Sequence, residues 1–153
     1  MHQLIGKRVG DALEERCPDE FIVNIEQAIV INRRNELHPD VVILREEAAF
    51  VSPLSAGDVP LVVEVLSRSI RRSDRNGKLD KYASAGIRFY WIVDPLAARV
   101  TSTQFVLRID GRYEQVVHID NLVTVEEPWK ITLDLPAWTA KLDHLRRVAR
   151  RHK

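Results

Sequence analysis

The apolar segment Pro60-Leu61-Val62-Val63-Glu64-Val65-Leu66-Ser67 constrains the fold of this chain more than any other stretch. Apolar residues at consecutive positions are typical of a β-strand that is buried on both faces. One carboxylate, Glu64, lies within this run, and its burial is costly unless a cation, a metal or a shifted pKa compensates. A carboxylate in such a place is more often functional than one on a solvated face, so Glu64 is the first candidate site residue.

Hydrophobic periodicity and turn signals divide the rest of the chain into further helices and strands. Helices are expected over residues 2–16, from Ser73 or Asp74 to about residue 85, and from Pro136 onward with Leu142, Leu145 and Val148 facing inward. Strands are expected at residues 21–25, 28–31, 41–44, 60–66 and 89–93, and at most one short strand in 126–135. A polar turn is expected at 33–36 and a loop at 46–59. A hairpin is expected whose arms, 99–109 and 112–118, flank Asp110-Gly111. This order predicts an α/β fold with a mixed β-sheet flanked by helices and an added C-terminal β-hairpin at a sheet edge.

The bulk properties of the chain fit a globular protein. A length of 153 residues and a hydrophobic content of 45% predict a single domain over residues 1–153. Lys and Arg (23) nearly balance Asp and Glu (22), so the net charge of +1 favours no class of partner by itself. The single cysteine, Cys17, excludes an internal disulfide and a multi-cysteine metal site, and no disulfide-linked partner is expected. We find no apolar run long enough to span a membrane and no signal-peptide pattern, so no membrane association and a cytoplasmic location are expected.

Positive charge is concentrated at two places in the chain. The connector after the strand at 60–66 carries four arginines: Arg68, Arg71, Arg72 and Arg75. The C-terminus carries five basic residues: Arg146, Arg147, Arg150, Arg151 and Lys153. The first group is expected to contact phosphates, which provides affinity without sequence specificity. The second group could do the same, although a solvated helix end is the commoner reason for such a pattern.

Two acids and two lysines form the candidate catalytic group: Asp40, Glu64, Lys78 and Lys81. If the strand that Asp40 begins lies beside the strand at 60–66, the two acids meet at one end of the sheet. Two close carboxylates repel each other unless a divalent cation lies between them, and oxygen ligands suit Mg²⁺ or Mn²⁺. Such an ion activates water and stabilises charge on a phosphoryl oxygen, and a nearby lysine can orient the attacking water. This combination suits phosphodiester hydrolysis.

Each of these residues also has a simpler interpretation. Asp40 could terminate a turn, and Glu64 could form an ion pair with Arg45 or Lys78. Both lysines could be solvated helix residues. The five histidines are scattered without the spacing of zinc ligands, so a zinc site is not expected. The hypothesis therefore depends on whether the fold brings the two acids together.

Four segments of the chain resemble the Uma-two family of endonucleases, which has the restriction-endonuclease-like PD-(D/E)XK fold. They are His38-Pro39-Asp40-Val41-Val42-Ile43, Pro60-Leu61-Val62-Val63-Glu64-Val65-Leu66-Ser67, Arg72-Ser73-Asp74-Arg75-Asn76-Gly77-Lys78-Leu79-Asp80-Lys81-Tyr82, and Ala85-Gly86-Ile87-Arg88-Phe89-Tyr90-Trp91-Ile92-Val93-Asp94-Pro95. The resemblance implies a core sheet with a helix on either side, and a metal site on Asp40 and Glu64 that holds Mg²⁺ or Mn²⁺. It also implies endonuclease activity on DNA. Superfamily members often dimerise so that each protomer cuts one strand, and a homodimer is therefore expected.

The chain departs from the superfamily pattern at the catalytic lysine. The position two residues after the second acid usually holds lysine, and here it holds Leu66. The lysine role is therefore expected in the following helix, where Lys78 matches the family's recurrent lysine and Lys81 is a local alternative. In relatives a further strand and acid precede the helix that begins here at His2, and this segment is expected to be absent. The predicted function is a Mg²⁺-dependent DNA endonuclease, and the alternative is an impaired nuclease-fold module that binds nucleic acid or a protein partner.

Overall fold

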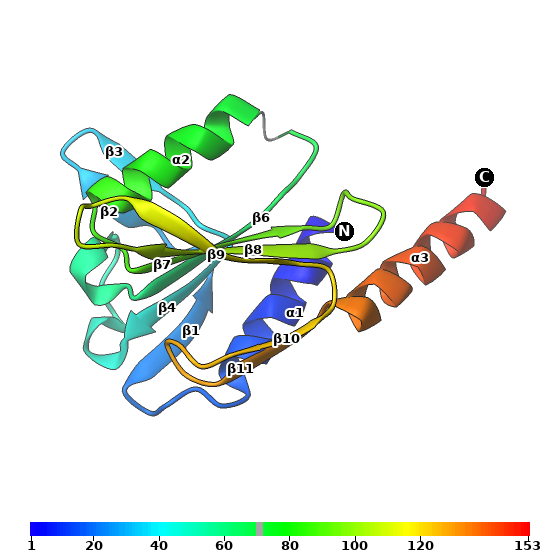
Figure 1. Ribbon diagram of the computed structural model, residues 1–153, viewed down its shortest axis with the longest axis horizontal. Helices are drawn as coiled ribbons and strands as arrows, with labels where there is room; N and C mark the ends of the chain where they lie inside the picture. Colours follow the sequence, from blue (N-terminus) through cyan, green and yellow to red (C-terminus); the bar gives the residue numbers. More distant parts are fainter. Residues whose placement is uncertain (70–71) are drawn as a thin grey trace.

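The main element of the fold is a sheet of six strands in the order β1-β4-β6-β7-β8-β9 (Figure 1). The computed structural model describes residues 1–69 and 72–153, and the side chains of residues 72–76 lie outside this description. The strands of the main sheet are β1 (Phe21–Ile25), β4 (Val41–Arg45), β6 (Leu61–Val65), β7 (Phe89–Asp94), β8 (Thr101–Leu107) and β9 (Tyr113–Ile119). The helices are α1 (His2–Glu14), α2 (Arg72–Ser84) and α3 (Leu135–Arg151).

Two smaller groups of strands accompany the main sheet. One is a three-stranded sheet of β3 (Asn35–Leu37), β2 (Ile29–Asn32) and β5 (Leu54–Ser55), in that spatial order. The other is the antiparallel pair of β10 (Leu122–Val125) and β11 (Ile131–Asp134). The first group contacts α2 through β2, and the second contacts α1 through β11. Among the described residues, no helix is long and apolar enough to cross a lipid bilayer.

A parallel pair, β6 and β7, occupies the middle of the main sheet. Leu61 is paired with Phe89 at one end of this pair and Val65 with Val93 at the other. The other neighbouring strands of the sheet are antiparallel, so the sheet is mixed, as the sequence predicts. Parallel neighbours need a long crossover, and α2 lies within the crossover from β6 to β7. All five residues of β6 are buried, because both faces of this strand are covered.

The two faces of the sheet carry separate hydrophobic clusters. Successive residues of a strand point to opposite faces. Val63 therefore packs with residues of α1 and of the first half of α3, whereas Val62 packs with Tyr82 of α2. Figure 1 shows α2 on one side of the sheet, and α1 with β10 and β11 on the other. The same alternation assigns Glu64 to the face that α2 covers.

Most of the predicted helices and strands are confirmed to within two residues at each end. Three short strands differ from expectation: β3 begins inside the predicted turn at 33–36, β5 lies inside the predicted loop at 46–59, and β10 was not predicted. Strands of two to four residues are too short for their periodicity to be recognised. Val148 is 36% exposed and does not face inward, because α3 extends beyond the sheet (Figure 1).

Gly86 ends α2 and determines how this helix meets β7. Its φ of 81° is a left-handed conformation that glycine adopts without strain. The amide of Ile87 donates to the carbonyl oxygen of Tyr82 at 3.2 Å, and the amide of Gly86 donates to that of Ala83 at 3.0 Å. These two bonds form a Schellman motif. The motif turns the chain directly into the buried Ile87 and then β7, so it helps to hold α2 against the sheet.

Candidate active site

Glu64 is the more buried of the two candidate acids, with a side chain only 4% exposed, whereas that of Asp40 is 16% exposed. It faces α2, where Lys78 and Tyr82 are four residues apart and therefore lie on the same side of the helix. The Lys78 Nζ lies 3.2 Å from Glu64 Oε2. The Tyr82 hydroxyl donates to Glu64 Oε1 at 2.7 Å. Both carboxylate oxygens are thus held by groups from one helix.

Burial raises the pKa of Glu64, and the nearby charge of Asp40 raises it further. The ammonium group of Lys78 and the hydroxyl of Tyr82 oppose this rise without cancelling it. Burial and the charge of Glu64 also raise the pKa of Tyr82, which therefore remains a neutral hydrogen-bond donor. The surroundings of Glu64 thus favour its negative charge less than water does.

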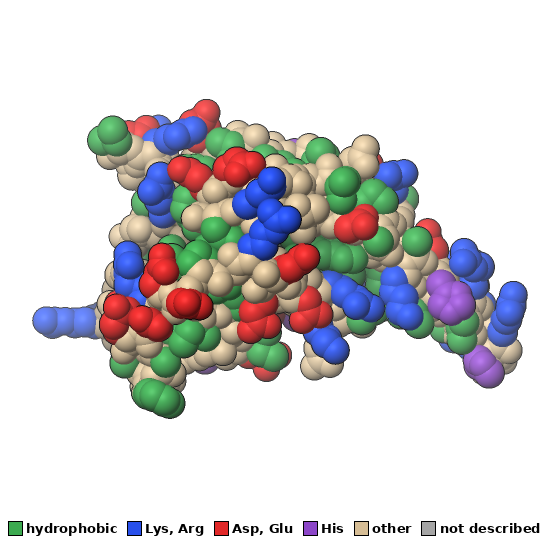
Figure 2. All heavy atoms as spheres, turned by 90° about the horizontal axis from the view of Figure 1, so that it is seen from below, with side chains coloured by type: hydrophobic (Ala, Val, Ile, Leu, Met, Phe, Trp, Pro, Cys, Tyr) green, Lys and Arg blue, Asp and Glu red, His purple; other side chains and the backbone are tan. Residues whose placement is uncertain are grey.

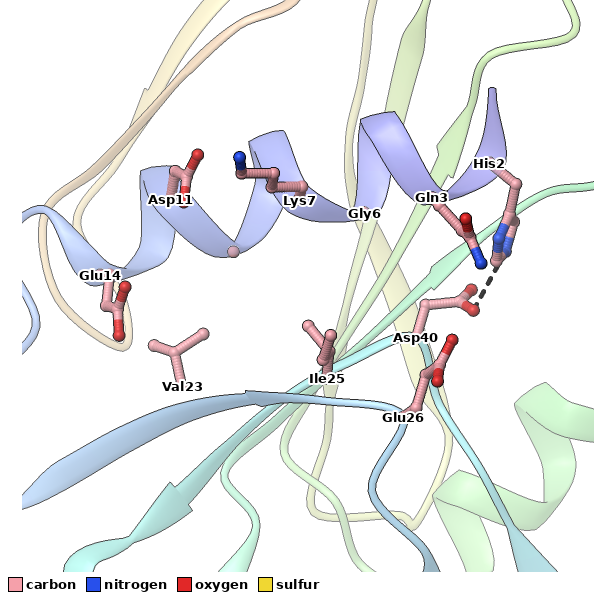
Figure 3. A pocket seen from close by; sticks show the side chains of 11 residues that line it. His2, Gln3, Gly6, Lys7, Asp11, Glu14, Val23, Ile25, Glu26 and Asp40 are labelled. Atoms are coloured by element: carbon pink, nitrogen blue, oxygen red, sulfur yellow. Dashed lines mark ion pairs between the residues drawn. The ribbon is translucent and has the colours of Figure 1, made fainter.

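Asp40 immediately precedes β4, and the register of the antiparallel β4–β6 pair brings it to Glu64. Val41 is paired with Val63, so continuing this register by one residue puts Asp40 opposite Glu64. Asp40 Oδ2 accepts a hydrogen bond of 2.6 Å from the backbone amide of Val65. Its Oδ1 lies 3.0 Å from Nε2 of His2 at the start of α1 (Figure 3). The Asp40 side chain is 16% exposed, so it is the more accessible of the two acids.

A pocket of about 420 Å³ lies beside Asp40, between α1 and β1. Figure 3 shows the side chains of His2, Asp40 and Glu26 together at one end of this pocket, and Asp11 and Glu14 toward the other. Glu26 has a left-handed backbone, with a φ of 51°, and its amide donates to the Asp40 carbonyl oxygen at 3.1 Å. Asp40 lines the pocket and Glu64 does not. Solvent therefore approaches the paired acids from the Asp40 side through this opening.

The donor set at the two acids fits a hard divalent cation. Each carboxylate has about four lone-pair positions, so the hydrogen bonds and ion pairs described above leave acceptor capacity on both groups. Within the described part of the chain, no group of three or more His, Cys, Asp and Glu side chains could hold a metal ion. Two carboxylates suit Mg²⁺, which keeps several water ligands, better than a metal that needs a cage of protein ligands. The raised pKa of Glu64 fits as well, because a cation would offset the burial of its charge.

Comparison with known proteins identifies the family of this chain. Residues 1–143 match the family Uma2, described as "Putative restriction endonuclease". The chain belongs to the Uma2 family. A crystal structure of "a putative nuclease belonging to DUF820" from Anabaena variabilis is similar, with a TM-score of 0.55 and 16% sequence identity over 82% of this chain and 69% of that chain. At this identity the likeness shows a shared fold alone. No match was found among curated proteins.

The structure separates the two lysines that the Uma2 resemblance proposes for the site. Lys78, 28% exposed, points at Glu64, whereas the side chain of Lys81 is exposed three residues further along α2. Lys81 has no ion pair with any residue that the structure describes. Leu66, at the usual lysine position, is buried in the cluster under α2. The ammonium group therefore reaches the site from α2 and not from β6.

The four arginines predicted to bind DNA are described unequally. Arg68 is exposed just after β6. Arg71 lies outside the described residues, and so do the side chains of Arg72 and Arg75. The capping roles predicted for Ser73 and Asp74 fall on undescribed side chains as well. Of the connector arginines, only Arg68 can be placed relative to the acids of this Uma2 protein.

Sequence reasoning missed two residues that contact the acids. Tyr82 is absent from the candidate residues that the sequence indicates, yet its hydroxyl donates to Glu64. Its position four residues after Lys78 was an available signal, because residues at this spacing lie side by side on a helix. His2 was set aside with the other histidines. No local pattern could have connected His2 to Asp40, because their contact joins α1 to the start of β4.

Proposed function

We propose that this protein is a metal-dependent endonuclease that hydrolyses DNA phosphodiester bonds. The observation that carries the proposal is the convergence of Asp40, Glu64 and Lys78 where β4 begins and β6 ends, with Lys78 Nζ 3.2 Å from Glu64 Oε2. Membership of a family described as restriction endonucleases agrees with this chemistry. On this proposal residues 1–153 act as one nuclease domain.

Asp40 and Glu64 would hold one Mg²⁺ or Mn²⁺ ion. When bound, such an ion lowers the pKa of a water molecule and stabilises negative charge on a phosphoryl oxygen. Tyr82 holds Glu64 in place, and the Val65 amide and His2 hold Asp40, so both acids are positioned before substrate arrives. Preorganised groups of this kind stabilise a transition state without having to reorganise during the reaction.

Lys78 is the residue that we propose to act on the reacting phosphate. Its ammonium group is partly exposed, so it can donate a hydrogen bond to the attacking water or to a phosphate oxygen while it remains near Glu64. The water oxygen forms a new bond to phosphorus as the bond to the leaving sugar oxygen breaks. The attacking water loses a proton, and the leaving oxygen takes one up. Arg68 would contact a neighbouring phosphate.

An impaired module that only binds nucleic acid or a protein partner is the competing function. Leu66 at the usual lysine position favours it, because the common catalytic lysine is replaced by a buried apolar residue. The direction of Lys78 favours the nuclease, since this lysine points toward the acids and not away from them. The two functions differ in one measurable property, the metal-dependent cleavage of DNA.

Nicking of supercoiled plasmid DNA in the presence of Mg²⁺ or Mn²⁺ tests the proposal. Asp40→Ala and Glu64→Ala are each expected to abolish nicking, and Lys78→Met to reduce it by about 10² or more. Lys81→Met, a matched change on the same helix, is expected to retain activity. Calorimetric titration with Mn²⁺ should show binding that both acid variants lose. Nicking retained in both acid variants would exclude this metal site, and no nicking by the unaltered protein would favour the binding module.

Cleavage of both strands of a duplex in one encounter would use two active sites, one for each strand. A homodimer would supply them, and sedimentation equilibrium at micromolar concentrations measures this directly. A monomer that nicks one strand at a time would be consistent with the catalytic proposal and would exclude the homodimer.

A further inference from the structure

The C-terminal end of the chain differs sharply in charge from the rest. Residues 144–153 contain five of the 23 Lys and Arg residues and none of the 22 Asp and Glu residues. The remaining 143 residues therefore carry 18 basic and 22 acidic residues, an excess of four negative charges. The match to the Uma2 family ends at residue 143, so this basic segment lies outside the matched region.

The first half of α3 is fixed to the body of the protein. Leu135, Trp138 and Leu142 are buried in the core cluster beneath the sheet. The amide of Val100 donates to Thr139 Oγ1 at 3.0 Å. Arg146 provides the last attachment, because its Nη2 donates to the carbonyl oxygen of Pro95 at 3.1 Å. The direction of the rest of the helix is therefore set by packing of its first half.

Beyond Arg146 the helix leaves the protein surface. Every residue from 147 to 153 is exposed. Figure 1 shows this end of α3 extending away from the sheet, with the C-terminus at its far end. Figure 2 shows blue Lys and Arg side chains and purple His side chains gathered there, whereas red and blue side chains are mixed over the body. An α-helix of fixed direction thus presents a cluster of positive charge to solvent.

Three arginines of this segment share one side of the helix. Arg147, Arg150 and Arg151 are spaced by three and four residues, so their side chains are neighbours. None of the three forms an ion pair with a residue that the structure describes, whereas Arg146 is paired with Asp143. Their charge is therefore available to a polyanion.

A hollow at the base of the basic segment is lined by residues that neighbour the candidate active site. The hollow, of about 320 Å³, is lined by Arg146, Pro95, Arg68, Leu66 and His2, among others. His2 is the residue that contacts Asp40, and Leu66 is two residues from Glu64. Arg68 and Arg146 thus share one hollow with His2, the residue that contacts Asp40.

We propose that the last two turns of α3, with Arg147, Arg150 and Arg151, form an arm that binds the phosphate backbone of DNA next to the active site. The proposal extends the nuclease function and rests on it for the identity of the polyanion. A membrane surface is a poorer match, because interfacial helices need a broad apolar face and Val148 is the exposed large apolar residue on this part of α3. Backbone contacts would provide affinity without sequence preference.

The test is DNA binding by a variant that combines Arg147→Gln, Arg150→Gln and Arg151→Gln. Glutamine keeps the helix propensity and removes the charge. The matched control combines Arg16→Gln, Arg33→Gln and Arg34→Gln, which removes three charges from exposed positions outside α3. Affinity for a 30-base-pair duplex is measured by fluorescence anisotropy in EDTA, so that no cleavage occurs, over a range of salt concentrations. Circular dichroism and thermal melting check that both variants are folded.

The arm variant is expected to bind DNA more weakly than the control, and the slope of log K against log salt concentration should decrease by about 2.7 for three lost contacts. Nicking at saturating DNA should persist, with KM raised and kcat unchanged. Equal DNA affinity and equal salt slope in the two variants would overturn the proposal that the arm binds DNA, and would leave the proposed nuclease activity unaffected. DNA binding that depends on the arm, without any nicking by the unaltered protein, would instead overturn the proposed nuclease activity and support the proposed role of the arm.

Two further measurements identify other occupants of the arm. Binding to vesicles of phosphatidylserine and phosphatidylcholine that depends on the three arginines, without an effect on DNA affinity, would overturn the proposal in favour of a membrane surface. A dimer that is lost in the arm variant, again without an effect on DNA affinity, would overturn it in favour of a contact between two copies of the chain. Unchanged vesicle binding and unchanged oligomeric state, together with weakened DNA binding, support the arm.

Discussion

Glu64 lies where burial and a second acid both disfavour its charge, and this has a consequence for stability. A carboxyl group whose pKa is higher in the folded than in the unfolded protein binds more protons in the folded state. The folded state therefore loses stability relative to the unfolded state as the pH rises above the ordinary glutamate pKa of about 4.3. A bound cation would remove much of this effect.

In EDTA, the free energy of unfolding of the unaltered protein should fall relative to that of Glu64→Gln as the pH is raised from 4 toward 8. The amide cannot ionise, so the variant lacks this penalty at high pH. Urea denaturation at a series of pH values measures the difference. Glu47→Gln, at an exposed position, is the matched control. A difference between the unaltered protein and Glu64→Gln that grows as the pH falls would contradict the raised pKa.

Tyr82 and Tyr113 make comparable hydrogen bonds with different expected effects on function. The Tyr82 hydroxyl binds Glu64 at 2.7 Å, and the Tyr113 hydroxyl binds the carbonyl oxygen of Ile87 at 2.6 Å. Each Tyr→Phe change should lower the free energy of unfolding by about 1 to 3 kcal/mol, because a buried acceptor loses its donor. Only Tyr82→Phe should also weaken Mn²⁺ binding, measured by calorimetry. Equal loss of Mn²⁺ affinity in the two variants would mean that Tyr82 has a purely structural role.

At the scale of whole elements, α2 matters most for the candidate site because it carries both side chains that hold Glu64. Its position depends on the turn at Gly86, where φ is positive, and on the packing of Tyr82 beneath it. Gly77 is also in α2, but its φ is not positive, and no atom lies within 4 Å of where a Cβ would be. The backbone therefore requires glycine at position 86 but not at position 77.

Gly86→Ala should lower the free energy of unfolding by about 1 to 2 kcal/mol, because alanine is strained in the left-handed conformation. Gly77→Ala should raise it by about 0.5 to 1 kcal/mol, because alanine favours the helix and reduces the entropy of the unfolded chain. Chemical denaturation of the two variants measures both values. A loss of stability in Gly77→Ala as large as that in Gly86→Ala would mean that backbone conformation does not distinguish the two sites.

The helices and strands that could be predicted from the sequence are those that are buried on both faces or that have a regular apolar repeat. β6 and β7 were recognised because they are apolar at almost every position, and α1 because its apolar residues repeat at helical spacing. β3, β5 and β10 escaped because they are short, and the pairing of β2 with β5 joins segments that are distant in the chain. The start of α3 was recognised, but its projection was not, because where a helix leaves the core depends on the extent of the sheet beneath it.

For the molecule as a whole, a metal site on Asp40 and Glu64 would couple metal binding to global stability. A ligand that binds only the folded state raises the free energy of unfolding by about 2.7 kcal/mol when its concentration is 100 times its Kd. Mg²⁺ or Mn²⁺ should therefore raise the Tm of the unaltered protein, as measured by scanning calorimetry. Asp40→Asn should abolish this increase in Tm.

The control for metal-linked stability is Lys81→Met, which should keep the full metal-dependent increase in Tm because this side chain is exposed and away from the acids. Potassium chloride at equal ionic strength separates specific binding of the divalent cation from a general effect of salt. An equal rise in Tm for the unaltered protein and Asp40→Asn would exclude this aspartate as a metal ligand.

The sequence by itself determined which segments form the interior and which acid has a buried charge that a cation must offset. Both properties depend on the chemistry of neighbouring residues. It indicated Glu64 and two lysines in the following helix, but it could not choose between Lys78 and Lys81. Only the tertiary structure decided that choice, since the packing of α2 on the sheet turns Lys78 toward Glu64 and leaves Lys81 in solvent. The β4–β6 register and the start of α1 similarly decided the partners of Asp40. Such contacts join residues that are far apart in the chain, and their formation depends on how whole elements pack.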